Sequence, residues 1–287
     1  MADAGGRVTK DLLGEIPHLI VVILLILVLL FVVTKFKWVH CSQIPQWCDV
    51  YCSINGKSQV AIIHGPASDP GLGDASALHN QILTQRKFTY AAMFEASQLS
   101  QGLLDDYELV ILTHVKNISL RQAITLRDYL NRGGSILWEG DAGSSYVLTR
   151  EDESYALAEN LSNPGYYEYY EELLDSSAGF GLLGDALGIK YLGNQPKTGG
   201  ARFYAVKLNH LILSGVKNFE LPPAPFAKVT ENPAVLTKVA EIELNGVKYP
   251  ALLERKYVGR IIYIAVPLEY VNSRTLTSNA LDYLVSC

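Results

Sequence analysis

Residues 105–138 read DDYELVILTHVKNISLRQAITLRDYLNRGGSILW, and this stretch decides the fold class. Its apolar run at 109–114 is short and continuous, which is typical of a strand buried in a parallel sheet. Ser119 suits the cap of a helix that runs to Asn131 and carries its leucines and isoleucine on one face. A double glycine ends this helix, and another apolar run begins at Ser135. A strand, a helix and a strand with short connections predict a right-handed βαβ unit.

The sequence before this unit repeats the same alternation. Residues 57–65 form another short apolar run, 66–74 a loop rich in Gly, Pro and Asp, 75–85 a helix, and 88–94 a further strand. Strands that alternate with helices through short loops are typical of a doubly wound sheet. We therefore predict an α/β fold of the flavodoxin-like kind with a mostly parallel sheet.

A tyrosine-rich insertion interrupts this alternation at about residues 144–203. We expect helices and loops there, lying over one end of the sheet. The tyrosines either pack the insertion against the core or form the rim of a binding site, because a tyrosine combines a large apolar ring with a polar tip. They are Tyr146, Tyr155, Tyr166, Tyr167, Tyr169 and Tyr170.

The C-terminal part returns to strands, at 235–244, 247–254 and 260–266. Asn245-Gly246 separates the first two, and this dipeptide between alternating runs is the strongest short signal for a hairpin. We predict that an antiparallel meander closes the domain, with a last helix at about 273–285.

An apolar segment precedes the α/β domain, which we place at 58–287. Between Glu15 and Lys35 the chain has 19 uncharged positions, and a helix of that length crosses a hydrocarbon core of roughly 30 Å. We predict a tail at 1–15, a single transmembrane helix at 16–34 that contacts the lipid bilayer, and a juxtamembrane neck at 35–57. A cleaved signal peptide is the alternative, although its apolar region is usually about 7–15 residues long.

Four cysteines lie outside the predicted core strands: Cys41, Cys48, Cys52 and Cys287. An even number in such positions indicates disulfides, or plain thiols, and the former require an oxidising compartment. A metal site with His40 is the alternative, but the spacing fits no common zinc motif, and we predict no metal. Sequons at Asn117 and Asn160 also favour an extracytoplasmic domain, whereas the positive charges on the two sides of the helix are balanced.

The charge balance argues against nucleic acid as a partner. Of the 287 residues, 24 are Lys or Arg and 29 are Asp or Glu, which gives a net charge of -5, and no basic run occurs. Gly71-Leu72-Gly73 lacks both the P-loop lysine and the full set of dinucleotide-binding glycines, so we expect no cofactor.

Three passages resemble the class I glutamine amidotransferase-like superfamily, in particular its ThuA-like and related non-amidotransferase branches. They are the unit at 105–134, HLILSGV at 210–216, and GRIIYIAVPLE at 259–269. Together they cover the chain from about residue 58 to 287. The resemblance implies an amidotransferase-like α/β domain behind the N-terminal anchor.

The catalytic residues of that superfamily do not carry over. Its members place a nucleophilic cysteine on a strained turn after a central strand, where this chain has Glu139-Gly140-Asp141, and Ser144 lies beyond the turn. Val266 stands at the position expected for the histidine. Because a thiolate needs a base and the base needs a nucleophile, the resemblance implies no amidotransferase or peptidase activity.

Polar side chains gather at the predicted carboxyl edge of the sheet, where doubly wound folds bind ligands. The two carboxylates that flank Gly140 suit an acid–base pair or a hard cation. Alternatively, Asp141 caps backbone amides while Glu139 is solvated or pairs with a basic side chain. The catalytic candidates are Asp141, Glu139, His64 and Glu269, and the ligand-binding candidates are Asp74, Gly71, Gly73 and His114, with Asp69 beside them.

We expect a membrane-anchored, non-catalytic domain that binds a small ligand, a glycan or a protein partner at the membrane surface. The alternatives are a ThuA-like hydrolase with a carboxylate and histidine site, and a structural subunit of a membrane complex or homo-oligomer. An enzyme requires that Asp141 and Glu139 face an open pocket with His64 or His114 in reach. Burial of both carboxylates in local caps argues against it.

Overall fold

The computed structural model describes residues 5–35, 39, 41, 44–87, 89–148, 150–162, 168, 170–171, 180–256 and 258–285, with only the backbone given for 5–16, 159, 162, 182 and 185. The chain divides into two compact units, Met1–Gly56 with Ser286–Cys287, and Lys57–Val285. Each unit is described by itself.

The first unit contains one long helix, α1 (Gly5–Lys35), in which Pro17–Lys35 are 19 residues with a mean hydropathy of 3.0. The apolar side chains from Leu19 to Leu29 are exposed, for example Leu25 at 63%, and Leu30, Phe31 and Val33 are half-buried. Its length and composition satisfy the requirements of a membrane span, and a signal sequence near the N-terminus satisfies them equally.

A short helix, α2 (Trp47–Asn55), folds back on the end of α1. The indole Nε1 of Trp47 donates a hydrogen bond to Thr34 Oγ1 at 2.9 Å, and the rings of Phe31 and Tyr51 lie 5.1 Å apart. Burial of these aromatic rings gives the predicted neck a small apolar core of its own.

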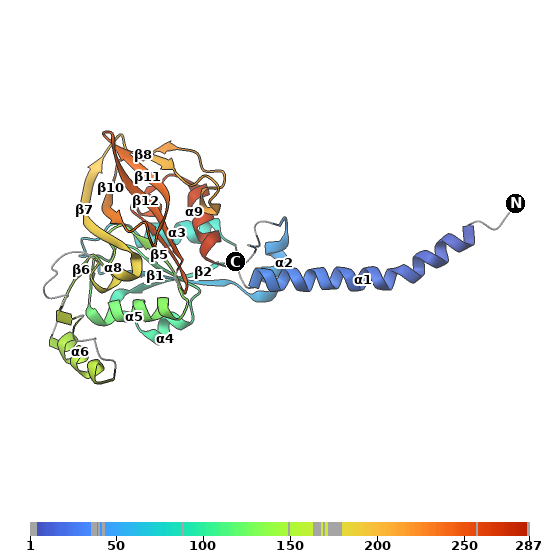
Figure 1. Ribbon diagram of the computed structural model, residues 1–287, viewed down its shortest axis with the longest axis horizontal. Helices are drawn as coiled ribbons and strands as arrows, with labels where there is room; N and C mark the ends of the chain where they lie inside the picture. The colour runs from blue at the N-terminus through green and yellow to red at the C-terminus, as the bar shows by residue number, and fades with distance from the viewer. Residues whose placement is uncertain are drawn as a thin grey trace. The chain divides into compact units, whose positions relative to one another are not determined.

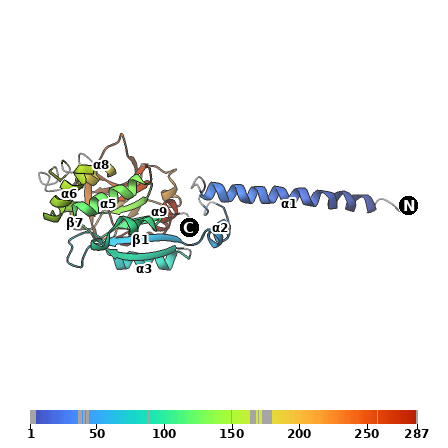
Figure 2. The same ribbon diagram turned by 90° about the horizontal axis from the view of Figure 1, so that it is seen from below.

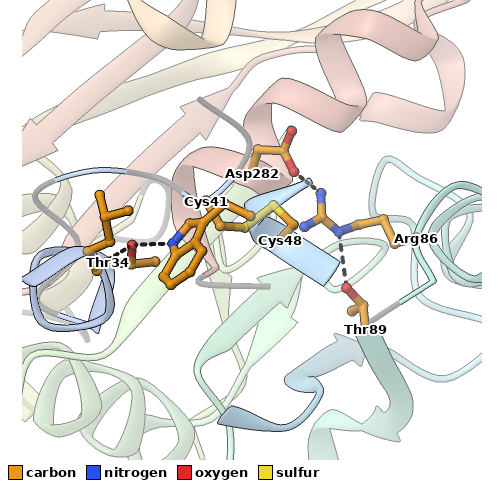
Figure 3. Close-up of a disulfide and its surroundings, with 8 residues drawn as sticks. Thr34, Cys41, Cys48, Arg86, Thr89 and Asp282 are labelled. Carbon is orange, nitrogen blue, oxygen red and sulfur yellow. Dashed lines mark hydrogen bonds and ion pairs between the residues drawn. A yellow bond between two sulfur atoms is a disulfide. The ribbon is translucent and has the colours of Figure 1, made fainter. Parts of the chain in front are cut away.

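Cys41 and Cys48 form a disulfide in this unit, as Figure 3 shows. Cys52 is disulfide-bonded as well, no cysteine in the described part of the chain is free, and Cys287 lies outside it. His40 also lies outside the described residues. Cys41, Cys48 and Cys52 are therefore disulfide-bonded, as one of the two expectations had it, and a sulfur in a disulfide does not serve as the thiolate ligand that zinc requires.

The second unit is built on a nine-stranded sheet in which the first five strands are parallel and the other four antiparallel. The five parallel strands stand in the order 2-1-3-4-5 of their sequence, which is the flavodoxin-like order. From edge to edge the strands are β2 (Thr89–Glu95), β1 (Ser58–His64), β3 (Leu109–Leu112), β5 (Ser135–Glu139), β13 (Arg260–Ile264), β12 (Val247–Lys256), β11 (Thr237–Leu244), β8 (Arg202–Ala205) and β9 (Phe219–Glu220).

Helices cover both faces of this sheet (Figure 1). In Figure 2, α3 (Ala75–Gln85) and α5 (Leu120–Asn131) lie on opposite sides of β1. The last helix, α9 (Arg274–Leu284), lies beside α3, because Arg86 at the end of α3 pairs with Asp282 (Figure 3). A one-turn helix, α4 (Gln101–Asp105), packs against α5.

Local signals in the sequence account for the ends of these elements. Ser119 and Gln122 form a capping box at α5, with each side chain bonded to the other residue's backbone N–H. The hairpin at Asn245 and Gly246 has φ values of 53° and 78°, which are the left-handed conformations of a type I′ turn. The predicted alternation, the antiparallel meander and the last helix are thereby confirmed.

The meander joins the parallel part of the sheet, since β13 is antiparallel to β12 on one side and parallel to β5 on the other. The sheet is therefore one layer that changes from parallel to antiparallel pairing at β13. A close backbone approach supports this junction: a Cβ atom on Gly259 would lie 1.9 Å from Gly134 O. Gly259 has no room for a side chain against this backbone, and a Cβ on Gly134 would lie 2.2 Å from the ring of Tyr129.

The insertion at 144–203 differs from the expected helices and loops. It contains α6 (Arg150–Ser162) and α8 (Leu182–Leu187), but also the ten-residue strand β7 (Ile189–Thr198), which pairs with β10 (Ala224–Glu231) in a separate two-stranded sheet. Another small pair joins β4 (Asn117–Ile118) to β6 (Ser145–Tyr146). The β7 strand was missed because its burial does not alternate along the strand and two register shifts interrupt its pairing.

Two of the insertion's tyrosines pack it against the domain. Tyr146 donates to Phe180 O at 2.6 Å, and the guanidinium of Arg121 lies over the ring of Tyr155 at 5.1 Å. Tyr170 is buried. Tyr166, Tyr167 and Tyr169 lie outside the described residues.

Candidate functional site

A single loop, residues 65–74, lies across the carboxyl ends of β1 and β3. These strands are the switch point of the sheet, because the chain leaves them in opposite directions, and ligands of doubly wound folds bind there. Gly65 N donates to His114 O and His114 N donates to Leu72 O, both at 2.8 Å. The carboxyl-edge loop, as we call residues 65–74, is thus fixed by backbone bonds to the segment that follows β3.

Asp69 holds the middle of the carboxyl-edge loop and is 7% exposed. Its Oδ1 accepts from Gly71 N and Lys116 N, both at 2.8 Å. Its Oδ2 accepts from Asn117 N at 3.1 Å and from Asn117 Nδ2 at 3.2 Å. A carboxylate that receives four N–H groups is satisfied, so Asp69 fixes the loop to the segment that follows β3.

Asp141 holds the loop from the other side and is fully buried. Its Oδ1 accepts from Leu72 N and its Oδ2 from Asn194 Nδ2, both at 2.7 Å, while Lys116 Nζ lies 3.8 Å from Oδ2. The expectation that Asp141 caps backbone amides is met in part, although the amide belongs to the distant loop and not to the following turn.

We considered that Glu139 is solvated or pairs with a basic side chain. Instead, it is fully buried and has no basic partner among the described residues. Its Oε1 accepts from Leu268 N at 3.2 Å, and its Oε2 has no partner among the described residues. Burial, with the nearby carboxyl of Glu269, raises the pKa of Glu139 well above its ordinary value. The nearby Thr113 hydroxyl lowers the pKa of Glu139 in part, although the Thr113 oxygen does not meet the geometric criteria for a hydrogen bond.

Glu269 lies on a short 3₁₀ turn, η4 (Leu268–Tyr270), which follows β13. Its Oε1 accepts from Asp74 N, and its Oε2 is buried with no partner in the described part of the chain. Burial raises the pKa of Glu269 to about 7, against the lowering effect of backbone N–H donors. The Asp74 carboxyl raises it further.

Among the described residues, neither candidate histidine has a carboxylate as its hydrogen-bond partner. His64 Nδ1 lies 2.7 Å from Gly65 O, and His114 Nδ1 lies 2.9 Å from Gly71 O. A carbonyl only accepts, so each Nδ1 carries a proton toward the carboxyl-edge loop. A general base would need its free nitrogen directed at a nucleophile, and these two histidines are held in structural contacts.

The other predicted ligand-binding residues place the loop close to the strand ends. A Cβ on Gly71 would lie 2.8 Å from the backbone N of both Val115 and Lys116, and one on Gly73 would lie 2.1 Å from Thr113 Oγ1. Asp74 caps α3 by accepting from Ala77 N at 2.9 Å. Their role as ligand-binding residues stays a prediction.

The turn after β5 offers no nucleophile. Gly140, at the position where the resemblance expects the strained nucleophile, has φ 57° and no side chain. Leu72 covers it, because a Cβ on Gly140 would lie 3.0 Å from Leu72 Cβ. Ser144 is 2% exposed and so is closed to a substrate.

Two pockets open beside the loop. The edge pocket, of about 400 Å³, is lined by Pro66, Ser68, Asp69, Asn117, Ile118, Ser119, Gln122 and Val147. The helix pocket, of about 670 Å³, lies between α3 and the start of α9 and includes Glu269, Tyr270 and Arg274. In the described part of the chain, no group of three or more His, Cys, Asp or Glu is placed to hold a metal ion.

Sequence reasoning missed the partners that close this site. Asn194 and Asp141 are 53 residues apart, and Leu72 and Asp141 are 69 apart, so no local pattern links them. A second buried group was also missed, in which His210 Nε2 lies 3.2 Å from Glu254 Oε2 and Tyr283 donates to Glu254 Oε1. His210 belongs to one of the passages that carry the resemblance, and this was its only signal.

Comparison with known proteins supports the fold and identifies no family. No protein-family model matches the chain, and no curated protein matches it. A β-galactosidase from Bacillus circulans sp. alkalophilus is similar in structure, with a TM-score of 0.56 and 14% identity over 80% of this chain and 31% of that chain. This chain therefore spans about a third of the length of that enzyme.

Smaller proteins are similar over nearly their whole length. A ThuA-like protein from Bacteroides uniformis ATCC 8492 gives a TM-score of 0.54 and 13% identity over 80% of this chain and 92% of that chain. A cytoplasmic protein from Salmonella typhimurium LT2 gives 0.50 and 13% over 79% and 98%. At such identities the likeness establishes a ThuA-like, flavodoxin-like α/β fold and no activity.

Proposed function

We propose that this chain is a membrane-anchored, non-catalytic binding domain of ThuA-like, amidotransferase-like fold, which takes a small neutral polar ligand in its edge pocket. The observation that carries the proposal is the closure of the candidate site by the carboxyl-edge loop. Asp141 and Asp69 bind backbone N–H groups of the chain, and both histidines contact loop carbonyls. Groups engaged in this way position a loop and do not exchange protons with a substrate.

The lining of the edge pocket supports the class of ligand. Ser68, Asn117, Ser119 and Gln122 supply hydroxyl and amide groups, and Ile118 and Val147 supply an apolar wall. No Lys or Arg is among the lining residues, and the Asp69 carboxylate is already satisfied. A neutral molecule with hydroxyl or amide groups and an apolar side fits this lining better than an anion does, and about 400 Å³ suits a small ligand.

The edge pocket and the ends of the second unit lie at opposite edges of the parallel strands. Lys57 precedes β1, and Tyr283, near the end of α9, accepts from Arg260 at the start of β13 at 2.8 Å. Both ends of the second unit therefore lie at the amino edge of the parallel strands. The edge pocket lies at the opposite, carboxyl edge of these strands.

The disulfides favour an extracytoplasmic side for the protein, because the cytosol keeps thiols reduced. The sequon at Asn117 adds little to this argument. Its Nδ2 donates to Asp69, and a glycan on that nitrogen would have to break the contact.

A role as a subunit of a membrane complex is the second candidate, and α6 favours it. Leu157 and Leu161 are four residues apart on this helix and are 49% and 89% exposed. Side chains at this spacing share one helix face, so they form a small apolar surface on a helix that is otherwise strongly polar. Such a surface suits a protein partner.

The test compares two exposed valines in the full chain, purified in detergent. Val147→Arg fills the edge pocket, whereas Val258→Arg is a matched control at the amino edge; the two side chains are 51% and 71% exposed. We expect mass spectrometry of the wild type and of the Val258 variant to find a co-purified small molecule that the Val147 variant lacks. A ligand retained by all three proteins, or hydrolytic turnover that Asp141→Asn abolishes, would overturn the proposal. Loss of a co-purified protein on Leu161→Glu alone would favour the second candidate.

A further inference from the structure

Three buried side-chain oxygen atoms near the carboxyl-edge loop have no hydrogen-bond partner among the described residues. They are Glu139 Oε2, Glu269 Oε2 and Thr113 Oγ1. Their residues lie close to one another: Leu268, whose N–H donates to Glu139 Oε1, is the neighbour of Glu269, and a Cβ on Gly73 would lie 2.1 Å from Thr113 Oγ1 and 3.1 Å from Glu269 Oε1. Unsatisfied buried polar atoms are rare in folded proteins, so a cluster of three calls for a physical cause.

In the described part of the chain, neither carboxylate of this cluster forms an ion pair with a positive charge. The titratable groups that face it are Asp74, from the start of α3, and Tyr270, on η4. Two buried carboxylates at close quarters cannot both ionise, and one proton shared between them removes the conflict.

We propose that Glu139 and Glu269 share one proton, and that this proton keeps the carboxyl-edge loop closed. When the pair loses the proton to water, both carboxylates are charged and repel each other and Asp74. Glu269 then turns outward and releases the backbone N–H of Asp74 that it holds. The loop loses that hydrogen bond first. It is then held by its remaining hydrogen bonds, among them those to Asp141 and within itself to Asp69, which are weaker restraints than the complete set.

The helix pocket gives Glu269 a route to solvent. Glu269 and Arg274 both line it, and Arg274 is exposed and has no ion-pair partner in the described part of the chain. The ionised Glu269 carboxylate therefore finds a cation on the far side of the same pocket. The closed state has the proton, and the open state has a Glu269–Arg274 ion pair in its place.

The direction of the effect follows from the raised pKa values. Since burial raises the pKa of Glu269 to about 7, the folded protein holds the proton well above the ordinary range of a glutamate. The pair therefore favours the closed fold at acidic pH, and this contribution is lost as the pH rises through about 7. The loop is closed below that pH and opens above it.

Hydrogen exchange of the full chain in detergent, without ligand, tests the proposal. After correction for intrinsic exchange rates, we expect protection of residues 66–74 to fall by about tenfold or more between about pH 6 and about pH 8.5. Glu269→Gln cannot ionise and is expected to abolish this dependence. Glu153→Gln, at an exposed position of α6, is the matched control and is expected to leave it unchanged.

A second variant tests the same proposal independently in case Glu269→Gln disturbs the fold. Arg274→Gln changes only an exposed side chain, and it is expected to move the opening to higher pH because it removes the cation that receives Glu269. Protection of 66–74 that does not vary with pH in the wild type would overturn the proposal, as would an unchanged profile in both variants. Because no ligand is present, this outcome is separate from that of the edge-pocket experiment.

Discussion

At the scale of single residues, carboxylates fix this domain in three different ways. Asp69 and Asp141 are satisfied by N–H donors, Glu139 and Glu269 lack a partner for one oxygen each, and Glu254 is buried against His210 and Tyr283. The difference lies in the number of donors within reach, since all five side chains are buried wholly or in part. Donors near a carboxylate favour its charged form, and their absence favours the protonated form.

Glu254 therefore gives the opposite pH dependence from the Glu139–Glu269 pair. Burial alone would raise its pKa, but hydrogen bonds from His210 and Tyr283 outweigh burial and lower the pKa to about 2. The stabilisation is present above the ordinary glutamate pKa, on the order of 3 kcal/mol, and is lost as the pH falls through about 2. His210 Nδ1 accepts from Ile212 N, so the proton on Nε2 is the one that reaches Glu254.

We expect Glu254→Gln to reduce the free energy of unfolding at neutral pH and to flatten its decrease in acid. The measurement is urea unfolding of wild type and variant between about pH 7 and about pH 2.5, followed by tryptophan fluorescence. Glu220→Gln, on the exposed edge strand β9, serves as a control with an unchanged profile. Parallel acid profiles for wild type and the Glu254 variant would show that the buried group does not carry this dependence.

At the scale of secondary-structure elements, turn chemistry sets the β11–β12 hairpin. Gly246 has φ 78° and open space around the position of a Cβ atom, so a substitution there meets backbone strain and no clash. We expect Gly246→Ala to lower the free energy of unfolding by about 1 kcal/mol. Gly102 in α4 also has open space but no positive φ, and Gly102→Ala is expected to raise it by about 0.5–1 kcal/mol. Two alanine variants with the same sign in a chemical unfolding experiment would contradict this reasoning.

The elements that the sequence predicted are those with local signals. The helix at 75–85 and the strands around it have caps, apolar runs and glycine stops within a few residues, and the structure places them at those positions. The strands β7 and β10 lack such signals, because β7 contains Gly193 and Pro196 and pairs with a segment almost thirty residues away. Helix α2 was missed because the cysteine-rich neck resembles a linker in sequence, and the packing of its aromatic residues is evident only in the structure.

The location of the candidate site was predictable from the sequence, but the burial of its residues was not. The order of strands put the charged residues at the carboxyl edge, and Glu139, Asp141 and Glu269 do lie near the carboxyl-edge loop. Whether such residues are open to solvent depends on how a loop folds over them, and the bonds that fold it connect residues 69 and 116, or 72 and 141. Contacts at that separation leave no periodicity in the sequence.

At the scale of the whole molecule, the two units have separate roles in the function that we propose. The first unit supplies an apolar helix of 19 residues and a disulfide-bonded neck, and the second supplies the edge pocket and the carboxyl-edge loop. Nothing in the chemistry of the second unit requires a membrane. In the proposed function, the apolar helix therefore acts through location, by keeping a ligand-binding domain at a surface.

The anchor itself gives the prediction on which this location depends. We expect the full chain to stay with membranes in alkaline carbonate and to keep its N-terminus, since the 19-residue stretch Pro17–Lys35 is long and apolar enough to cross the bilayer. Leu24→Arg with Val28→Arg places two charges near the middle of the helix, each at a cost of about 2.5–3.5 kcal/mol, and is expected to move the protein to the soluble fraction. Val258→Arg adds the same charge to the second unit and is expected to leave the protein in the membrane fraction. A mature N-terminus beyond residue 35 in a soluble product would identify the helix as a cleaved signal sequence, and the domain would then act free of the membrane.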